Sequence, residues 1–224
     1  MTELVIIRHG ETAWNRELRF QGQHDVALND MGWEQARRVA GHLAGEVADA
    51  LFSSDLARAR ETAQPLSDKL AMPIQQDSGL REQSFGLVEG LTAPEIRATH
   101  PEVLEHWARF DADYQIPQGG ESVRQFHARV VAAVARLARQ YAGLRLVVVT
   151  HGGVLDMLYH TAHRLPLDGP RQCEIPDGGF NRITAGLGEG GALELAITQW
   201  GDVSHLADMP AQPRYDQARV ATPR

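Results

Sequence analysis

Two short apolar runs in this chain each end in a histidine that is followed by a glycine. Residues 4–7 (LVII) lead into an RHG segment at His9, and residues 144–149 (LRLVVV) lead into a THG segment at His151. Continuous apolar runs with β-branched residues are typical of strands that are covered on both faces in a parallel sheet. Ligands of such sheets gather where strands end and loops begin. We therefore expect the two histidines to lie together at one edge of a parallel sheet.

Strand patterns alternate with helical patterns along the rest of the chain. Apolar residues recur at helical spacing in several segments, and capping-box sequences mark helix starts at Thr92 and Ser122. Asp55 is expected to cap the helix that follows it. The expected helices are residues 29–43, 56–70, 92–110, 122–137 and 154–163, and the expected strands are residues 4–7, 50–53, 74–81 and 144–149, with edge strands in 181–200.

This alternation predicts an α/β fold: a three-layer, doubly wound, mostly parallel sheet with helices on both faces. The 224 residues show no internal repeat and no linker, so we expect one domain over residues 1–209, with a small helical cap inserted at about residues 91–118. Residues 210–224 have no apolar period, and we expect them to form a mobile tail.

Composition excludes several classes of partner. The formal net charge is −7 and no lysine/arginine-rich block is present, which argues against nucleic acid or an anionic membrane as a partner. Cys173 is the only cysteine, so neither an intrachain disulfide nor a CxxC metal site can form. The chain shows no secretory leader pattern and no apolar run of about 20 residues. We therefore expect a cytoplasmic protein.

The residues around the two histidines are those that bind anions. Gly10 and Gly152 allow the backbone to leave each strand sharply, and their amides could then point at a ligand. Arg8, and Arg58 in the first turn of a helix, supply guanidinium groups that match phosphate oxygens with paired hydrogen bonds. Neutral donors on the first loop are Thr12 and Asn15. The pattern predicts a phosphate ligand and phosphoryl transfer.

Phosphoryl transfer requires a nucleophile and a proton for the leaving oxygen. His9 is the favoured nucleophile, because a neutral imidazole can attack phosphorus near physiological pH. Cys173 has no adjacent His-Gly or arginine partner and is not favoured. Glu82 follows the third expected strand, where its carboxyl group could reach the same edge and donate the proton.

Five ordered segments carry a family resemblance: RHGET, SSDLARARETA, LRE, GGES and VTHGG, followed by GDVSHL. The chain resembles the histidine phosphatase superfamily, in its phosphoglycerate mutase-like branch. The resemblance implies a doubly wound α/β sandwich that needs no metal. It also implies that His9 is the phosphorylated nucleophile and Glu82 the proton donor and acceptor. The implied phosphate clamp is Arg8, Asn15, Arg58 and His151, and the further substrate-pocket positions are Gln21, Gly22 and Arg60.

The segment after Glu82 departs from the mutase pattern. Cofactor-dependent phosphoglycerate mutases continue with an Arg-His-Tyr-Gly type segment and a basic insertion that holds a bisphosphate, whereas this chain reads QSFGLVEG and has no paired-arginine block before His151. We therefore expect a metal-independent phosphomonoesterase acting on a small phosphometabolite, without a cofactor. The alternative is a 2,3-bisphosphoglycerate-dependent mutase. A non-catalytic phosphate-binding module and a metal-dependent hydrolase are less favoured.

Two further features of the sequence bear on specificity and on metal binding. Apolar and aromatic residues of the cap are expected to line the substrate entrance; they are Ile96, Trp107, Phe110 and Tyr114. His160 and His163 have a spacing that could bind a metal, but no third ligand is evident, and a partly exposed helix end is the favoured interpretation. The sequence leaves open whether the chain forms a homodimer.

Overall fold

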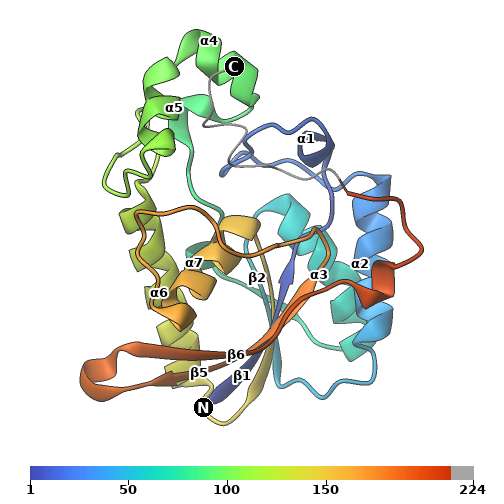
Figure 1. Ribbon diagram of the computed structural model, residues 1–224. Coiled ribbons are helices and arrows are strands. Elements are labelled where there is room, and N and C mark those ends of the chain that lie inside the picture. Colours follow the sequence, from blue (N-terminus) through green and yellow to red (C-terminus); the bar gives the residue numbers. More distant parts are fainter. Residues whose placement is uncertain (213–224) are drawn as a thin grey trace.

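The computed structural model describes residues 1–212, and the tail expected at residues 210–224 falls almost entirely outside this range. The described chain forms a six-stranded sheet in the order β3-β2-β4-β1-β5-β6 (Figure 1). The strands β1, β2, β3 and β4 are mutually parallel, and β5 is antiparallel to both of its neighbours. Their bounds are β1 Thr2–Arg8, β2 Ala50–Ser53, β3 Ile74–Gln76, β4 Arg145–Thr150, β5 Phe180–Leu187 and β6 Leu193–Asp202. The expected mostly parallel sheet is confirmed.

Helices cover both faces of this sheet, as expected (Figure 1). Side chains of β1 alternate between the faces, because successive residues of a strand point in opposite directions. Leu4 and Ile6 pack with the apolar residues of α6 (Val123–Gln140) and α7 (Gly152–His163). On the other face, Val5 and Ile7 pack with those of α2 (Asp30–His42) and α3 (Ala57–Leu70). The fold is therefore a three-layer, doubly wound α/β sandwich.

The cap lies beyond the carboxyl ends of the parallel strands and has its own apolar core (Figure 1). The Thr92 capping box is present, but the expected single helix is divided into α4 (Ala93–Thr99) and α5 (Pro101–Ala108). The division falls at His100, because the ring of a following proline disfavours helical backbone in the preceding residue. The remaining helix, α1, is Ala13–Arg16, and 3₁₀ turns span Ser78–Leu80, Gly86–Val88, Glu189–Gly191 and Ser204–Leu206.

Local capping signals are confirmed in two other helices. Asn29 accepts a hydrogen bond from the amide of Gly32 at the start of α2, and Ser122 forms its capping box with Gln125 at the start of α6.

The prediction that Asp55 forms the N-cap of α3 is wrong. The residue at the N-cap position is Leu56, which makes no side-chain cap. Asp55 instead forms two hydrogen bonds to the guanidinium of Arg81, at 2.7 and 2.6 Å. A bidentate pair with a guanidinium is stronger than a single bond to a helix amide, and it holds the pKa of Asp55 below its usual range.

Two strand expectations also require correction. The strand expected at residues 74–81 ends at Gln76, because Asp77 caps a 3₁₀ turn through the amide of Gly79. Residues 181–200 do not form two edge strands. They lie in a hairpin whose first strand, β5, is an inner strand beside β1, and only β6 lies at the edge.

None of the helices in residues 1–212 combines the length and the apolar character needed to cross a bilayer.

Candidate active site

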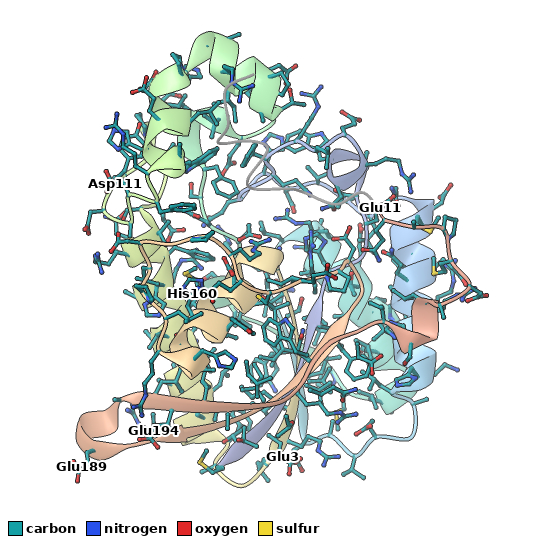
Figure 2. All side chains as sticks on the ribbon, in the orientation of Figure 1. Glu3, Glu11, Asp111, His160, Glu189 and Glu194 are labelled. Carbon is teal, nitrogen blue, oxygen red and sulfur yellow. The ribbon has the colours of Figure 1, made fainter. Side chains whose placement is uncertain are left out.

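The two His-Gly segments meet at one edge of the sheet, as expected. The last residues of β1 and β4 are paired, Arg8 with Thr150, so His9 and His151 follow in register. Their ring centroids are 5.2 Å apart and their planes are inclined by 60°. Figure 2 shows Glu3, near the start of β1, and Glu11, just past its end, at opposite ends of the sheet, with Glu11 on the side nearer the cap. The histidine pair therefore lies between the sheet and the cap.

His9 is held as a neutral ring with one nitrogen facing a cation. Its Nδ1 lies 2.7 Å from the carbonyl oxygen of Gly10, which assigns the ring proton to Nδ1. Its Nε2 accepts a hydrogen bond from Arg58 Nε at 3.3 Å. The side chain is only 3% exposed, and burial, then the charges of Arg58 and Arg8, hold its pKa well below the usual range. Nε2 therefore carries no proton at neutral pH, and its lone pair points toward Arg58.

Arg58 is a fully buried cation fixed by neutral partners. Its Nη1 donates to the carbonyl oxygen of His24 at 2.9 Å, and its Nη2 donates to that of Gly22 at 2.7 Å. Burial lowers the pKa of the guanidinium to about 10, which still leaves it charged near pH 7. Gly22 has φ +54°, and a Cβ there would lie 2.1 Å from Glu89 Oε1, so this loop requires glycine. The loop thus holds a positive charge beside His9.

Arg8 is oriented by a buried carboxylate that sequence reasoning did not identify. Its Nη2 lies 2.7 Å from Asp177 Oδ1, and its Nη1 donates to the carbonyl oxygen of Ile175. Asp177 is buried; burial raises the pKa of its carboxyl group, and the charge of Arg8 opposes that rise. Since Asp177 lies in an irregular segment after α7 with no motif around it, no sequence signal pointed to it.

Two buried nitrogens at this edge have no hydrogen-bond partner in residues 1–212: Arg8 Nε and His151 Nδ1. Ser54 Oγ accepts from Leu56 N, and among residues 1–212 its hydroxyl proton has one acceptor within reach, His151 Nε2 at 2.8 Å; with the hydroxyl as donor, the imidazole proton is assigned to Nδ1. Both unpartnered atoms are then donors. Buried donors almost always have an acceptor in native proteins. The pair therefore indicates an acceptor, such as an anion, between the two strand ends.

Glu82 joins this group through the amino end of α7. Its Oε2 accepts from the amide of Gly153 at 3.0 Å, and its Oε1 accepts from that of Gln83 at 2.9 Å. A Cβ on Gly153 would lie 2.0 Å from Glu82 Oε1, so only glycine allows this approach. Arg129 of α6, another residue missed by sequence reasoning, donates to the carbonyl oxygens of Gly79, Arg81 and Glu82. The segment that presents Glu82 is therefore fixed from both sides.

Of the remaining expected positions, some lie in the site and others support the loops around it. The amide of Gly152 begins α7 next to Arg8. The amide of Gly10 does not point at a ligand, because it donates to Thr62 Oγ1 at 3.0 Å; glycine is required there because a Cβ would lie 2.5 Å from the carbonyl oxygen of Gly32.

In the loop after β1, most polar side chains form hydrogen bonds with one another. Thr12 and Asn15 form the capping box of α1, and the Thr12 hydroxyl also lies 3.0 Å from Gln21 Oε1. Thr12 and Gln21 therefore shape the loop. Within residues 1–212, the side-chain nitrogen of Asn15, Nδ2, is the group of this capping box that can still donate to a ligand. Arg60 does not join the site: it donates to the carbonyl oxygen of Asp55 and borders a separate hollow beside β3.

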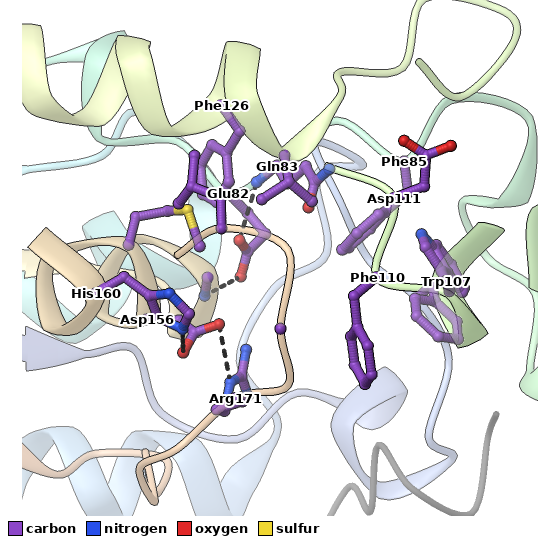
Figure 3. A pocket seen from close by; sticks show the side chains of 16 residues that line it. Glu82, Gln83, Phe85, Trp107, Phe110, Asp111, Phe126, Asp156, His160 and Arg171 are labelled. Atoms are coloured by element: carbon purple, nitrogen blue, oxygen red, sulfur yellow. Dashed lines mark hydrogen bonds and ion pairs between the residues drawn. The ribbon is translucent and has the colours of Figure 1, made fainter. Parts of the chain in front are cut away.

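A cavity of about 170 Å³ opens beside Glu82 (Figure 3). His9 and Arg58 are not among its lining residues, so it adjoins the histidine pair through Glu82 and Gly153. Its lining is Phe20, Glu82, Gln83, Phe85, Trp107, Phe110, Asp111, Val123, Phe126, Gly153, Asp156, Met157, His160, Leu167, Gly169 and Arg171.

The expected apolar entrance is confirmed for two of its four cap residues. Trp107 and Phe110 line the cavity, whereas Ile96 is buried in the core of the cap. Tyr114 is not in the lining; its ring stacks on His106 at 3.7 Å. His160 is not part of an exposed helix end: it is buried, with Nδ1 3.0 Å from the carbonyl oxygen of Pro166. Within residues 1–212, no three His, Cys, Asp or Glu side chains are grouped so as to hold a metal ion.

Comparison with known proteins identifies the family. The model of the histidine phosphatase superfamily (branch 1) matches residues 4–198. Phosphoglycerate mutase-like protein 4 of Arabidopsis thaliana is 39% identical over 92% of this chain and 87% of its own length. A metal-independent phosphoserine phosphatase of the same plant is 34% identical over 93% of this chain and 85% of its own. A mycobacterial glucosyl-3-phosphoglycerate phosphatase, solved with VO3, superposes with a TM-score of 0.78 at 29% identity and covers 89% of this chain and 98% of its own.

The match to the family model, residues 4–198, includes the cap and both histidine segments. The chain therefore belongs to the histidine phosphatase superfamily, in its phosphoglycerate mutase-like branch, and is a phosphoric monoester hydrolase of that family.

Proposed function

We propose that the protein is a metal-independent phosphomonoesterase that works through a phosphohistidine at His9. The observation that carries this proposal is a pair of buried donors, Arg8 Nε and His151 Nδ1, which have no partner in the described part of the chain and lie beside an imidazole whose Nε2 faces Arg58. These groups follow the ends of β1 and β4 or lie in the first turn of α3, and hydrogen bonds within the chain hold them before a ligand arrives. Preorganised donors of this kind are the main way in which a protein stabilises a phosphoryl group in transfer.

The first chemical step forms the phosphohistidine. The Nε2 lone pair of His9 forms a bond to phosphorus while the bond from phosphorus to the ester oxygen breaks. Glu82 gives its proton to that departing oxygen. The phosphoryl oxygens are held by donors of Arg8, Asn15, Arg58, His151 and Gly152, of which the two guanidinium groups carry the neutralising charge.

The second step releases phosphate. A water molecule gives a proton to Glu82, its oxygen bonds to phosphorus, and the bond from phosphorus to Nε2 breaks with return of the electron pair to His9. Glu82 is then protonated again, ready for the next ester. The position of Glu82, between the histidine pair and the cavity, suits both roles.

A phosphoglycerate mutase is the second candidate, and the name of the 39% identical relative favours it. The two relatives named as phosphatases favour hydrolysis, with phosphoserine and a glucosylated phosphoglycerate as the substrates in their names. Small phosphorylated metabolites of this size are our proposed substrates. Side-by-side measurement of phosphate release and of 2-/3-phosphoglycerate interconversion with 2,3-bisphosphoglycerate separates the two functions; interconversion faster than phosphate release would favour the mutase.

The test of the mechanism is the variant His9→Ala, assayed with p-nitrophenyl phosphate. We expect kcat to fall on the order of 10³-fold or more, as when a nucleophile is removed. Rapid quenching of the wild-type enzyme with ³²P-labelled substrate should trap an acid-labile, base-stable label that His9→Ala lacks. His163→Ala, at the exposed end of α7, is the matched control and should keep full activity. Full hydrolysis by His9→Ala would overturn the mechanism, and ligand binding without any turnover by the wild type would favour a non-catalytic module.

A further inference from the structure

A glutamine at the end of the described part of the chain holds the backbone of Asp177, whose carboxylate orients Arg8. Gln212 Oε1 accepts a hydrogen bond from the amide of Asp177 at 2.8 Å, and Gln212 Nε2 donates to the carbonyl oxygen of the same residue at 2.8 Å. The side-chain amide thus acts as a second peptide group. The two residues are 35 positions apart in the chain, and neither step of the proposed chemistry uses Gln212.

Asp177 depends on this amide because it is buried in a segment without regular structure. The residue is 3% exposed and lies between α7 and β5, outside any helix or strand. A buried backbone amide or carbonyl group without a partner costs free energy, and here no neighbouring turn or strand supplies one. Within residues 1–212, both backbone hydrogen bonds of Asp177 come from the side chain of Gln212.

The segment around Asp177 also holds Arg8 at three points. The amide of Arg8 donates to the carbonyl oxygen of Gly179 at 3.0 Å. Its guanidinium contacts the Asp177 carboxylate through Nη2 and the carbonyl oxygen of Ile175 through Nη1. Because all three partners belong to one short stretch of backbone, the position of Arg8 depends on where Gln212 holds that stretch.

The chain that carries Gln212 is itself anchored. Figure 1 shows this part of the chain (red) running beside α2 after the end of β6. Asp208 forms an ion pair with Arg38 of α2, and His205 Nε2 lies 3.0 Å from the carbonyl oxygen of Gly178. These contacts place the Gln212 amide against Asp177 from a packed segment.

The remaining donor of the Arg8 guanidinium gives this arrangement a function beyond stability. Arg8 Nε is buried and has no hydrogen-bond partner within residues 1–212. A guanidinium is a rigid planar fork, so contacts at Nη1 and Nη2 also fix the direction of its Nε–H group. The donor that a phosphoryl oxygen would meet is therefore aimed by the backbone that Gln212 holds.

We propose that Gln212 is a positioning residue of the phosphate site: its side-chain amide holds the backbone of Asp177, and through Asp177 it keeps the Arg8 guanidinium in the orientation that binds a phosphoryl oxygen. This assignment rests on the proposed function, because it takes Arg8 as a donor to the phosphate. It places the contribution of Gln212 in anion binding and not in proton transfer, since Glu82 is held by α6 and α7 instead.

Gln212→Met tests this assignment, because methionine has a similar length and can form neither hydrogen bond. We expect KM for p-nitrophenyl phosphate and the inhibition constant (Ki) of inorganic phosphate each to rise about tenfold, the usual effect of losing a hydrogen bond to a charged group, while kcat changes less than about threefold. The Ki reports anion binding without the chemistry. Gln212→Asn is one methylene shorter and can reach one of the two backbone groups, so it should give an intermediate Ki.

A double-mutant cycle separates positioning from a general loosening of the fold. If Gln212 acts through Asp177, Gln212→Met should raise the Ki of phosphate much less in an Asp177→Asn background than in the wild type, because the charge that it positions is already absent. Independent effects would multiply instead. Gln64→Met is the matched control, because Gln64 is an exposed glutamine of α3 whose amide donates to Asp68 on the same helix; its Ki should equal that of the wild type.

An unchanged Ki in Gln212→Met, or effects of Gln212→Met and Asp177→Asn that multiply, would overturn the assignment. Circular dichroism shows whether each variant is folded, and if Gln212→Met is not, an unchanged Ki in Gln212→Asn has the same meaning. If His9→Ala abolishes hydrolysis while the Ki in Gln212→Met is unchanged, the Gln212 assignment alone fails. If His9→Ala keeps full hydrolysis, the phosphohistidine mechanism fails, and the Ki of phosphate still decides the assignment of Gln212.

Discussion

Replacing Gly153 by alanine should separate catalysis from stability. In the native structure the new Cβ would lie 2.0 Å from Glu82 Oε1 and 3.0 Å from Phe126 Cε1, whereas ordinary contacts begin at 3.4 Å. The Glu82 carboxyl group is the end of a flexible side chain, so it moves, by about 1.4 Å or more, and loses its hydrogen bond from the Gly153 amide. A misplacement of about 1 Å in a reacting group costs about 10²-fold in rate.

The fold itself should lose little stability, because the gain in helix propensity offsets the tight contact with Phe126 Cε1. Gly153 lies in the first turn of α7, and alanine favours helix over glycine by up to about 1 kcal/mol. We therefore expect Gly153→Ala to lose about 10²-fold in kcat while its unfolding midpoint in urea is unchanged or raised. Gly41→Ala in α2, where a Cβ would meet nothing within 4 Å, is the control and should be stabilised with full activity.

The choice of substrate sharpens this test. A nitrophenolate leaves without much help from an acid, whereas a phenolate needs a proton. The loss in Gly153→Ala should therefore be larger with phenyl phosphate than with p-nitrophenyl phosphate. An equal loss with both esters, or full activity with phenyl phosphate, would mean that Glu82 does not donate the proton from this position.

Two further predictions concern the charges around the phosphate site. Asp177→Asn removes the charge that orients Arg8, so we expect KM for phosphate esters to rise more than kcat falls. The free energy of unfolding, measured by urea titration, should fall by roughly 1–3 kcal/mol. An unchanged KM would contradict the positioning role of Asp177. The buried imidazoles of His9 and His151 both have pKa values well below the usual range. Below about pH 6.5 the unfolded chain therefore binds more protons than the folded one. The free energy of unfolding should then fall with decreasing pH, by up to about 1.4 kcal/mol per pH unit for each ring. Urea unfolding between pH 7.5 and 5.5 measures this slope, and a slope in His151→Gln equal to that of the wild type would contradict it.

Some features of this protein follow from short stretches of sequence. The strands that end at His9 and His151 were predictable because a buried parallel strand is a continuous apolar run, and its neighbour meets it at the same edge. The capping boxes at Thr92 and Ser122 were predictable because every partner lies within three residues. The family segments, read in order, also placed the histidine pair in one site.

Other features depend on partners distant in sequence. Asp55 has a good capping sequence, yet it pairs with Arg81, 26 residues away, which only the packing of β2 and β3 brings within reach. Arg129 and Asp177 lie in segments without a motif, and their contacts with the loop of Glu82 and with Arg8 arise from the docking of α6 and of the segment after α7.

By itself, then, the amino-acid sequence determined the α/β architecture, the edge of the sheet that carries the site and the two histidines that face each other across it. These features depend on the spacing of apolar residues, on local helix capping and on where buried strands end, and each of these is set by a few neighbouring residues. The packing of residues 1–212 was needed to find that Arg8 Nε and His151 Nδ1 have no partner among these residues, and that Arg171 and Asp156 line the cavity beside Glu82. Hydrogen-bond satisfaction and the walls of a cavity are properties of the packed molecule, because each depends on groups that the chain brings together from many separate segments.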